Sequence, residues 1–399
     1  MTSRIYYTDP YCRRFEAVVT KAFEHEGRAA ALLDKTAFYP TSGGQPFDVG
    51  ALTARRGATE STVDVVDTVD LDDEVGHILS APLPAGTVVV GEIDWSRRFD
   101  HMQQHTGQHV LSAAFDRLFG NRTMSFHMGA ELSTIDLAKE MSWDQIARAE
   151  GEASRVIWDN RQVAIRFVSS DQATMLPLRK EPVRAGVLRL IEIQDFDLSA
   201  CGGTHVARTG AIGAIAVPAV EKFKGGVRVT FVCGARVLRV FGTLRESVAG
   251  SVRALSVLPQ ELPAAIERIQ TEARDLRRSI KRFQESLAAH EAARLAGEVV
   301  VEALDGWDAQ GLKTIAMEIT ARTRALVALF STTPPIAVVI ARSPDRQLDA
   351  ASVLRALTDR FGGRGGGKAD LAQGGGLSGN LVDICSAARE LLNRAASIP

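Results

Sequence analysis

Three histidines recur at helical spacing in the segment HMQQHTGQH, residues 101–109. His101, His105 and His109 are each four residues apart, so on a helix they would lie along one stripe. His101 and His109 would be separated by about 12 Å of helix rise, which is too far for both to bind one metal ion. The spacing leaves two candidate metal-binding pairs, His101 with His105 and His105 with His109. A histidine pair alone is more often part of an ordinary surface or core.

A second pair of candidate ligands lies in the segment CGGTH, residues 201–205. Cys201 and His205 have the spacing C-x3-H, and the two glycines between them allow the backbone to wrap closely around an ion. Together with two helical histidines they would supply the four ligands of a tetrahedral Zn²⁺ site. The alternative is a buried free cysteine beside an unrelated histidine. Cys12, Cys233 and Cys385 have no such neighbour and are interpreted as structural.

Two glycine-rich segments are candidate ligand-binding loops. In TSGGQP, Gly43 and Gly44 permit close approach of the backbone to a ligand, and Gln45 offers a donor and an acceptor. A tight hairpin turn explains the same residues. In GGRGGGK, free backbone amides beside Arg364 and Lys368 resemble a phosphate-binding loop.

The second segment is not an ATP-binding P-loop. Ala369 stands where that motif requires a hydroxyl for Mg²⁺. A flexible glycine linker is the alternative interpretation of this segment.

The chain that must position these residues is too long for one compact core, because it has 399 residues. Short β segments dominate the first 95 residues and predict a small barrel. A helix is predicted from Phe99 to Phe119 and is closed by Gly120. Strands follow, together with a helix that begins at the capping box of Ser142 and Gln145.

A long helix and a last α/β region are predicted after residue 250. Apolar residues recur in steps of four and three from Leu262 to Leu287, which is a heptad seam. Acidic residues nearly balance the arginines there, which favours a solvated helix that pairs with another helix, for example in a homodimer, over a tRNA-binding face. Further on we expect a helix at 312–329, a buried strand at 336–342, a helix at 350–361 and a final helix.

The expected fold class is therefore α+β multidomain. We expect a small N-terminal β-barrel at 1–95, a mixed α+β zinc-containing domain at 96–250, a long helical linker at 251–296 and a C-terminal α/β domain with a glycine-rich loop at 297–399.

Composition limits the function classes further. The chain has 47 Lys and Arg against 48 Asp and Glu, so binding of a polyanion would depend on local patches rather than on net charge. No apolar run is long enough to span a membrane, and the start MTSRIYYTDP lacks the pattern of an export signal. We therefore expect a cytoplasmic protein that does not bind membranes.

Four motifs carry a family resemblance. The order TAFYPTSGGQ, HTGQHVLSAAF and CGGTHV followed by TGAIG closely resembles the editing domain of alanyl-tRNA synthetase and the freestanding AlaX family, in its long form. The run GGRGGGKADLAQGGG resembles the last domain of the same synthetase. The synthetase carries an aminoacylation domain and a tRNA-recognition domain before its editing part, whereas here the barrel begins within the first twenty residues. The resemblance implies a free editing protein rather than a ligase.

The resemblance also implies roles for individual residues. It leaves His101 outside the metal site and gives Thr36 the hydroxyl that distinguishes serine from alanine. It places the glycine-rich loop TSGGQP in the pocket that binds this amino acid. The implied set is His105, His109, Cys201 and His205 for zinc, Thr36 and Gln45 for catalysis, Gly43 and Gly44 for substrate binding, and Arg364 and Lys368 for tRNA binding.

The implied activity is that of a zinc-dependent aminoacyl-tRNA hydrolase, which removes serine from mischarged alanine tRNA, with glycine as a second candidate. Zinc would either lower the pKa of a bound water or position the terminal adenosine. The residues indicate no separate general base. A non-catalytic tRNA-binding protein with a structural zinc site is the main alternative, and a metallohydrolase of small esters or amides is a more distant one.

Overall fold

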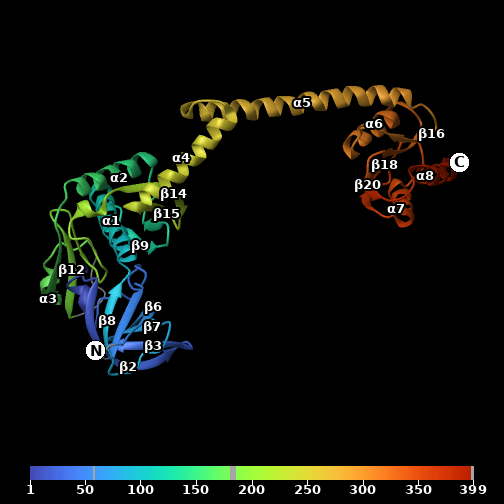
Figure 1. The fold of residues 1–399 in the computed structure, drawn as a ribbon. Helices are drawn as coiled ribbons and strands as arrows, with labels where there is room; N and C mark the ends of the chain where they lie inside the picture. The colour runs from blue at the N-terminus through green and yellow to red at the C-terminus, as the bar shows by residue number, and fades with distance from the viewer. Residues whose placement is uncertain (57–58, 180–185, 397–399) are drawn as a thin grey trace. The chain divides into compact units, whose positions relative to one another are not determined.

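The computed structural model describes residues 1–56, 59–179 and 186–396. The chain folds into two compact units, Met1–Gly250 and Ser251–Pro399 (Figure 1). Both units combine helices with sheets, which confirms the expected α+β multidomain class. The finer boundaries at residues 95 and 296 stay a prediction.

The expected N-terminal β-barrel is present and is closed by six strands. Along the first of them Phe15, Ala17 and Val19 point into the barrel core while their neighbours are exposed, which is the alternation of a half-buried strand. A short parallel pair, β1 (Ser3–Arg4) with β4 (Lys35–Thr36), joins the chain start to the segment that leads into the glycine-rich loop. In spatial order the barrel strands are β2 (Arg14–His25), β3 (Arg28–Leu33), β7 (Glu74–Leu79), β6 (Thr59–Leu71), β5 (Gly50–Arg56) and β8 (Val88–Ile93).

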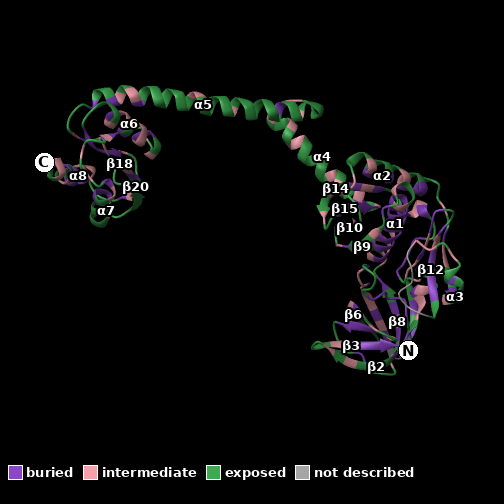
Figure 2. Ribbon diagram, turned by 180° about the vertical axis from the view of Figure 1, so that it is seen from behind, coloured by how far each residue is buried: buried purple, intermediate pink, exposed green. Residues whose placement is uncertain are grey.

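Helix α1 (Trp95–Phe119) follows the barrel directly and carries the histidine stripe. It begins one turn earlier than the sequence predicts, because the side chain of Asp94 accepts a hydrogen bond from the Arg97 amide and caps the helix there. It ends as predicted at Gly120, whose φ of 56° is left-handed. Most of its middle is buried in the main core of the unit, as Figure 2 shows.

Two sheets and a second helix pack around α1. Helix α2 (Trp143–Trp158) begins at Ser142, and both hydrogen bonds of the predicted capping box to Gln145 are present. Beyond a short helix, α3 (Ser170–Thr174), the strands complete this part of the unit. One sheet has the order β14 (Ile215–Phe223), β15 (Gly226–Cys233), β10 (Ser133–Leu137) and β9 (Thr123–Met128), and the other has β11 (Val163–Ser169), β12 (Val187–Ile193) and β13 (Asp197–Ala200).

Helix α4 (Ala235–Leu255) was not anticipated from the sequence. Its large apolar residues Leu238, Phe241 and Leu244 are exposed, and only Arg236 of the helix is buried. Because the helix buries so little of its apolar surface, its sequence was not recognised as that of a helix with one buried face.

The predicted long helix is α5 (Leu262–Arg294), which lies within the linker expected at 251–296 and continues two turns beyond the heptad seam. It is attached to its own unit through Ala288 and Ala292, which pack in one core with residues of α6 (Ala309–Arg322). Most of its remaining surface is exposed (Figure 2). The exposed apolar stripe, named here the heptad stripe, consists of Ile266, Ile269, Leu276, Ile280, Phe283 and Leu287.

The rest of the second unit is a five-stranded sheet covered on both faces. Helix α6 covers one face, and α7 (Ala350–Phe361) and α8 (Leu381–Ala396) cover the other. Only the first two strands of the described sheet run parallel. The strand order is β16 (Val299–Leu304), β17 (Leu326–Ser331), β18 (Ile336–Arg342), β20 (Leu371–Leu377) and β19 (Arg364–Gly367).

Two sequence predictions in this unit are wrong. The helix expected at 312–329 ends at Arg322, and Leu326–Ser331 is a fully buried strand, because a short apolar run does not reveal by periodicity whether it is helix or strand. The glycine-rich segment is a β-hairpin rather than a loop, with β19 at the edge of the sheet. Among the described helices, none is long and apolar enough to cross a membrane.

Candidate metal centre

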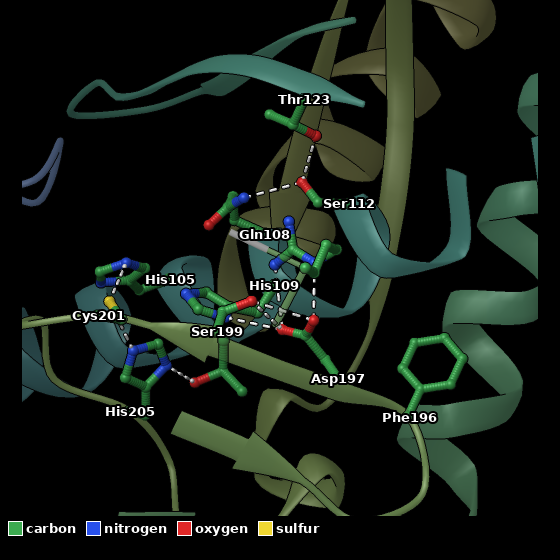
Figure 3. A network of polar contacts seen from close by, with 12 residues as sticks. His105, Gln108, His109, Ser112, Thr123, Phe196, Asp197, Ser199, Cys201 and His205 are labelled. Carbon is green, nitrogen blue, oxygen red and sulfur yellow. Dashed lines mark hydrogen bonds and ion pairs between the residues drawn. The ribbon is translucent and has the colours of Figure 1, made fainter. Parts of the chain in front are cut away.

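Four side chains from distant parts of the first unit converge on one point, as Figure 3 shows. The ligand atoms of His105, His109, Cys201 and His205 all lie within 4.8 Å of one another. Cys201 Sγ is 3.4 Å from Nε2 of His105 and 3.4 Å from Nε2 of His205. In a tetrahedral site with usual metal–ligand bonds, neighbouring ligand atoms are separated by about 3.5 Å. The cluster can therefore hold a metal ion with little rearrangement.

Helix α1 and the turn after strand β13 position the four ligands. His105 and His109 are one turn apart on α1, and Cys201 follows the last residue of β13. A Cβ atom on Gly203 would lie 2.1 Å from Cε1 of His105, so only glycine lets this turn approach the helix so closely. The glycine spacing noted in the sequence thus has a steric cause.

Gln45 bonds to the ring nitrogen of His105 that faces away from Cys201. Its Oε1 lies 2.8 Å from Nδ1 of His105 and accepts a hydrogen bond from the Thr204 amide at 3.0 Å. Its Nε2 donates to Thr204 Oγ1 at 2.8 Å. Because an amide oxygen can only accept, His105 carries its proton on Nδ1 and turns Nε2 toward Cys201. Gln45 is fully buried, and its described side-chain hydrogen bonds go to the ligand His105 and to Thr204, which precedes the ligand His205.

The other two histidines are oriented in the same way. His109 Nδ1 lies 3.1 Å from Asp197 Oδ2, and Asp197 also accepts hydrogen bonds from Arg179 at 2.7 and 3.0 Å. His205 Nδ1 lies 3.2 Å from Oγ1 of Thr106, whose own proton goes to a backbone carbonyl. Such outer partners fix ring orientation and tautomer at metal sites.

Burial and mutual interaction shift the pKa values of these groups. Burial raises the pKa of Cys201, but its electrostatic interactions with His105 and His205 outweigh this and lower it well below the usual value. The thiolate, which is the metal-binding form, is therefore favoured. Burial lowers the pKa of His109, but its hydrogen bonds to Asp197 and Cys201 raise it overall. Burial and His105 lower the pKa of His205 to about 3, which keeps that imidazole neutral.

Replacing Gln45 with leucine should weaken metal binding without removing a ligand. The substitution leaves His105 Nδ1 and the Thr204 amide without their acceptor, and loss of an outer hydrogen-bond partner typically lowers metal affinity about 10- to 100-fold. Competition with a chelator for added Zn²⁺ measures the change. Gln45→Glu keeps the acceptor and should stay within about threefold of the wild type. Equal affinities for wild type and Gln45→Leu would contradict this role.

A cavity of about 230 Å³ lies over the metal ligands. It reaches from the glycine-rich loop, through the cluster, to the far part of α1 and strand β9. Its lining includes Tyr39, Ser42, Gly43, His105, Gln108, His109, Asp116, Arg122, Thr123, Met124, Ser125, Phe126, Arg179, Ser199, Ala200, Cys201, Gly202 and Gly203.

The glycine-rich loop reaches this cavity through Gly43. The neighbouring Gly44 has a φ of +88°, and a Cβ there would lie 2.8 Å from the ring of Phe126 on β9. Both the backbone conformation and the close contact therefore require glycine at this position. The loop closes against the edge strand that forms one wall of the cavity.

Thr36 is fully buried and is not among the described residues that line the cavity. Its hydroxyl lies 2.8 Å from Nε2 of His77 and accepts a hydrogen bond from the Phe38 amide. His77 Nδ1 faces the Ala31 carbonyl, so Nε2 is the unprotonated nitrogen and Thr36 donates to it. Burial lowers the pKa of His77 to about 4 and keeps this arrangement neutral.

The remaining candidates lie elsewhere. His101 is 4% exposed, contributes no atom to the cluster, and its Nδ1 has no hydrogen-bond partner in the described structure. Arg364 and Lys368 belong to the second unit, on β19 and in the turn after it, and both are exposed. Asp197, Arg179 and the hydroxyl of Thr106 escaped the sequence analysis. Only Thr106 had a local signal, because it lies inside the histidine segment.

Three known domain families match separate parts of the chain. Residues 12–97 match the class II (A) tRNA synthetases, residues 188–228 match the threonyl and alanyl tRNA synthetase second additional domain, and residues 296–394 match the DHHA1 domain. The C-Ala domain structure from Aquifex aeolicus alanyl-tRNA synthetase matches 24% of this chain and 89% of that chain, with 27% identity and a TM-score of 0.22.

The barrel, the buried ligand cluster and the matched domains define a protein related to part of the alanyl-tRNA synthetases. An alanine–tRNA ligase of Pyrococcus furiosus is 32% identical over 94% of this chain, but this chain spans only 42% of that enzyme. The alanyl-tRNA editing protein AlaX-L of Pyrococcus horikoshii is 30% identical over 94% of both chains. The chain belongs to the AlaX-L family.

Proposed function

We propose that this protein is a trans-editing aminoacyl-tRNA deacylase that hydrolyses the ester between serine and alanine tRNA, with glycine as a second acceptable amino acid. The observation that carries the proposal is the four-ligand cluster open to a cavity, in a chain that belongs to the AlaX-L family. The cavity volume of about 230 Å³ suits a small aminoacyl group with part of its ribose better than a large side chain.

We propose Zn²⁺ as the metal, because three imidazoles and one thiolate in a compact buried set match its preferred ligands. When bound, the ion supplies positive charge beside the ester, which can stabilise a developing oxyanion or hold the terminal adenosine. Four protein ligands leave no open position for a metal-bound water, whereas catalytic zinc sites usually keep one position open. Gln45, Asp197 and Thr106 keep the three rings in place by bonding to their Nδ1 atoms.

Single-turnover hydrolysis of serine-charged alanine tRNA tests the proposal. We expect rapid deacylation of the seryl and glycyl esters, little of the alanyl ester, and loss of activity after treatment with a chelator. Tight binding of the tRNA without hydrolysis would instead favour a non-catalytic tRNA-binding protein with a structural metal site, which the closed set of four ligands also fits.

Thr36→Val should reduce selectivity for serine over alanine. The substitution keeps the shape of the side chain and removes its hydroxyl. In this structure that hydroxyl is bonded to His77 and the Phe38 amide and does not line the cavity, so binding of serine would exchange one of these bonds for one to the substrate hydroxyl. A site that binds a substrate hydroxyl loses about 1–3 kcal/mol of discrimination without its partner. The ratio of kcat/KM for seryl and alanyl esters measures this. Thr36→Ser retains the hydroxyl and its contact with His77, so it should preserve selectivity. An unchanged ratio in Thr36→Val would remove Thr36 from substrate selection.

We propose that the second unit binds the body of the tRNA. Support comes from two exposed cations beside the glycine hairpin, whose side chains make no ion pair within the described residues. The double variant Arg364→Ala, Lys368→Ala should weaken tRNA binding and reduce its salt slope by about 2, leaving the rate at saturating tRNA within about tenfold. Replacement of Arg360 and Lys313, two other cations of this unit, is the matched control. An unchanged salt slope would contradict tRNA contact here.

We also propose a homodimer through the heptad stripe of α5. Apolar residues at alternating steps of four and three exclude water when they pack against an equivalent stripe, and here they are about half exposed or more. The oligomeric state in solution tests this proposal.

A further inference from the structure

Most hydroxyl groups at the cavity wall are already engaged in internal hydrogen bonds. Each of these hydroxyls gives its one proton to an internal acceptor and so cannot donate to a substrate. The engaged groups are Tyr39, bonded to the Ser42 carbonyl, Thr123, bonded to Ser112, Ser125, bonded to Asp136, and Ser199, bonded to Asp197.

Gln108 differs from these residues because half of its amide is unused. It lies on α1 directly before His109, lines the cavity and is 7% exposed. Its Nε2 donates to Ser112 Oγ at 2.8 Å, and Ser112 is held in turn by the hydroxyl of Thr123 at 2.7 Å. Oε1 points away from Ser112 (Figure 3) and has no hydrogen-bond partner in the described structure. A buried acceptor with a fixed direction thus remains beside the metal ligands.

The chemistry of the proposed substrate indicates what this acceptor binds. An amino acid that is esterified to tRNA has lost its carboxylate, so its amino group is its only charged group, and a protonated amine can only donate. Hydrogen bonds from a charged donor are the stronger ones. The amino group also lies next to the ester carbon, so it must come to rest close to the cluster.

The carboxylates nearest to Gln108 are poorly placed for that amine, and of the two only Asp116 lines the cavity. Asp197 is engaged by Arg179 and His109. Asp116 is eight residues beyond Gln108, about 12 Å of rise along α1, which exceeds the reach of one small amino acid. Among the side chains that the structure describes in the lining, Gln108 offers a buried amide oxygen that makes no hydrogen bond of its own.

We infer that Gln108 Oε1 accepts a hydrogen bond from the α-amino group of the aminoacyl ester and thereby positions the ester beside the metal ligands. The inference rests on the proposed deacylase function. Serine, glycine and alanine all carry this amine, so Gln108 orients any aminoacyl group and does not select among them. Orientation and selectivity are then divided between Gln108 and Thr36.

The test compares two esters of the same alanine tRNA. One carries serine and the other carries 3-hydroxypropionate, which is serine without its amino group. Gln108→Met has nearly the same length but no acceptor, and it should lower kcat/KM for the seryl ester about 10- to 100-fold. For the ester without the amine the same variant should change kcat/KM less than about threefold. Gln108→Glu keeps an acceptor and should hydrolyse the seryl ester within about tenfold of the wild type.

An equal loss on both esters in Gln108→Met would overturn the inference and leave Gln108 a structural role. So would a wild type that hydrolyses the two esters equally well. Because each ratio is measured in one preparation, partial misfolding of a variant does not affect it. Failure of the wild type to hydrolyse either ester would instead refute the proposed function itself. Metal content of Gln108→Met should equal that of the wild type, since the residue is not a ligand.

Discussion

Replacing Cys201 with alanine is expected to abolish both metal binding and deacylation. Cys201 supplies the one sulfur ligand, and its Sγ lies 3.4 Å from Nε2 of both His105 and His205, so its loss opens one corner of the site. Metal affinity should fall by more than about 100-fold. This loss is larger than the one expected when only a residue that is hydrogen-bonded to a ligand is removed. Elemental analysis of the purified chain and the single-turnover rate measure the two effects.

Two matched variants control for this result. Cys12→Ala removes another half-buried thiol of the same unit that does not belong to the cluster, and it should keep full metal content. His101→Asn alters a histidine one turn from His105 and should also keep the metal. Full metal occupancy in Cys201→Ala would refute the assignment of the site.

Arg98→Met should destabilise the first unit by about 3–5 kcal/mol, because it leaves a buried carboxylate without its partner. Arg98 and Asp48 form an ion pair in which both side chains are completely buried. Arg98 Nε donates to Asp48 Oδ2 at 2.9 Å and Nη1 donates to the Pro10 carbonyl at 2.9 Å. Denaturant-dependent hydrogen exchange of amides in the barrel and α1 measures the free energy of unfolding of this unit.

A surface ion pair provides the comparison. Arg166 and Glu192 are 3.0 Å apart and both well exposed, so Arg166→Met should cost less than about 1 kcal/mol. In addition, the double variant Arg98→Met, Asp48→Asn removes the uncompensated charge and should recover part of the lost stability. If Arg98→Met proved no more harmful than Arg166→Met, the buried pair would not be what stabilises this unit.

The buried ion pair also affects the metal site, because Asp48 is hydrogen-bonded to Tyr39 and so joins the two ends of the glycine-rich loop. Asp48 Oδ2 accepts a hydrogen bond from the Tyr39 amide at 2.7 Å, and the Asp48 amide donates to the Tyr39 carbonyl. Gln45 lies between these two anchored points. Arg98→Met is therefore expected to weaken metal binding as well as stability.

The sequence predicted the ligand pairs better than it predicted their surroundings. His105 with His109, and Cys201 with His205, are local pairs, and local spacing on a helix or a glycine turn is visible in the sequence. Asp197 was not predicted as a partner of His109 because the two are 88 residues apart and are brought together by the packing of helix α1 against strand β13.

Gln45 shows a related limit of sequence analysis. The sequence shows that Gln45 has both a donor and an acceptor. It does not show in which direction these two groups point. Its partners His105 and Thr204 are 60 and 159 residues away. Which side of a loop faces a cavity depends on packing between elements, and packing leaves no periodic signal.

The same reasoning explains the fold predictions. The barrel and α1 were predicted because alternating strands and a helix closed by Gly120 have clear patterns. Leu326–Ser331 was assigned to a helix because every residue in it is buried, so it lacks the alternation that marks a strand with one exposed face. Helix α4 escaped prediction for the opposite reason, since its apolar residues are mostly exposed.

The distance along the chain between the two halves of the ligand cluster has a consequence for folding. Cys201 and His105 are separated by 96 positions, so the cluster forms only after the chain between them has adopted its sheets and helices. An ion that binds the assembled cluster favours the folded chain over the unfolded one by mass action. The melting temperature of the first unit should then follow the concentration of free metal in its surroundings, and newly made chains in metal-poor cells would unfold, and be degraded, more readily.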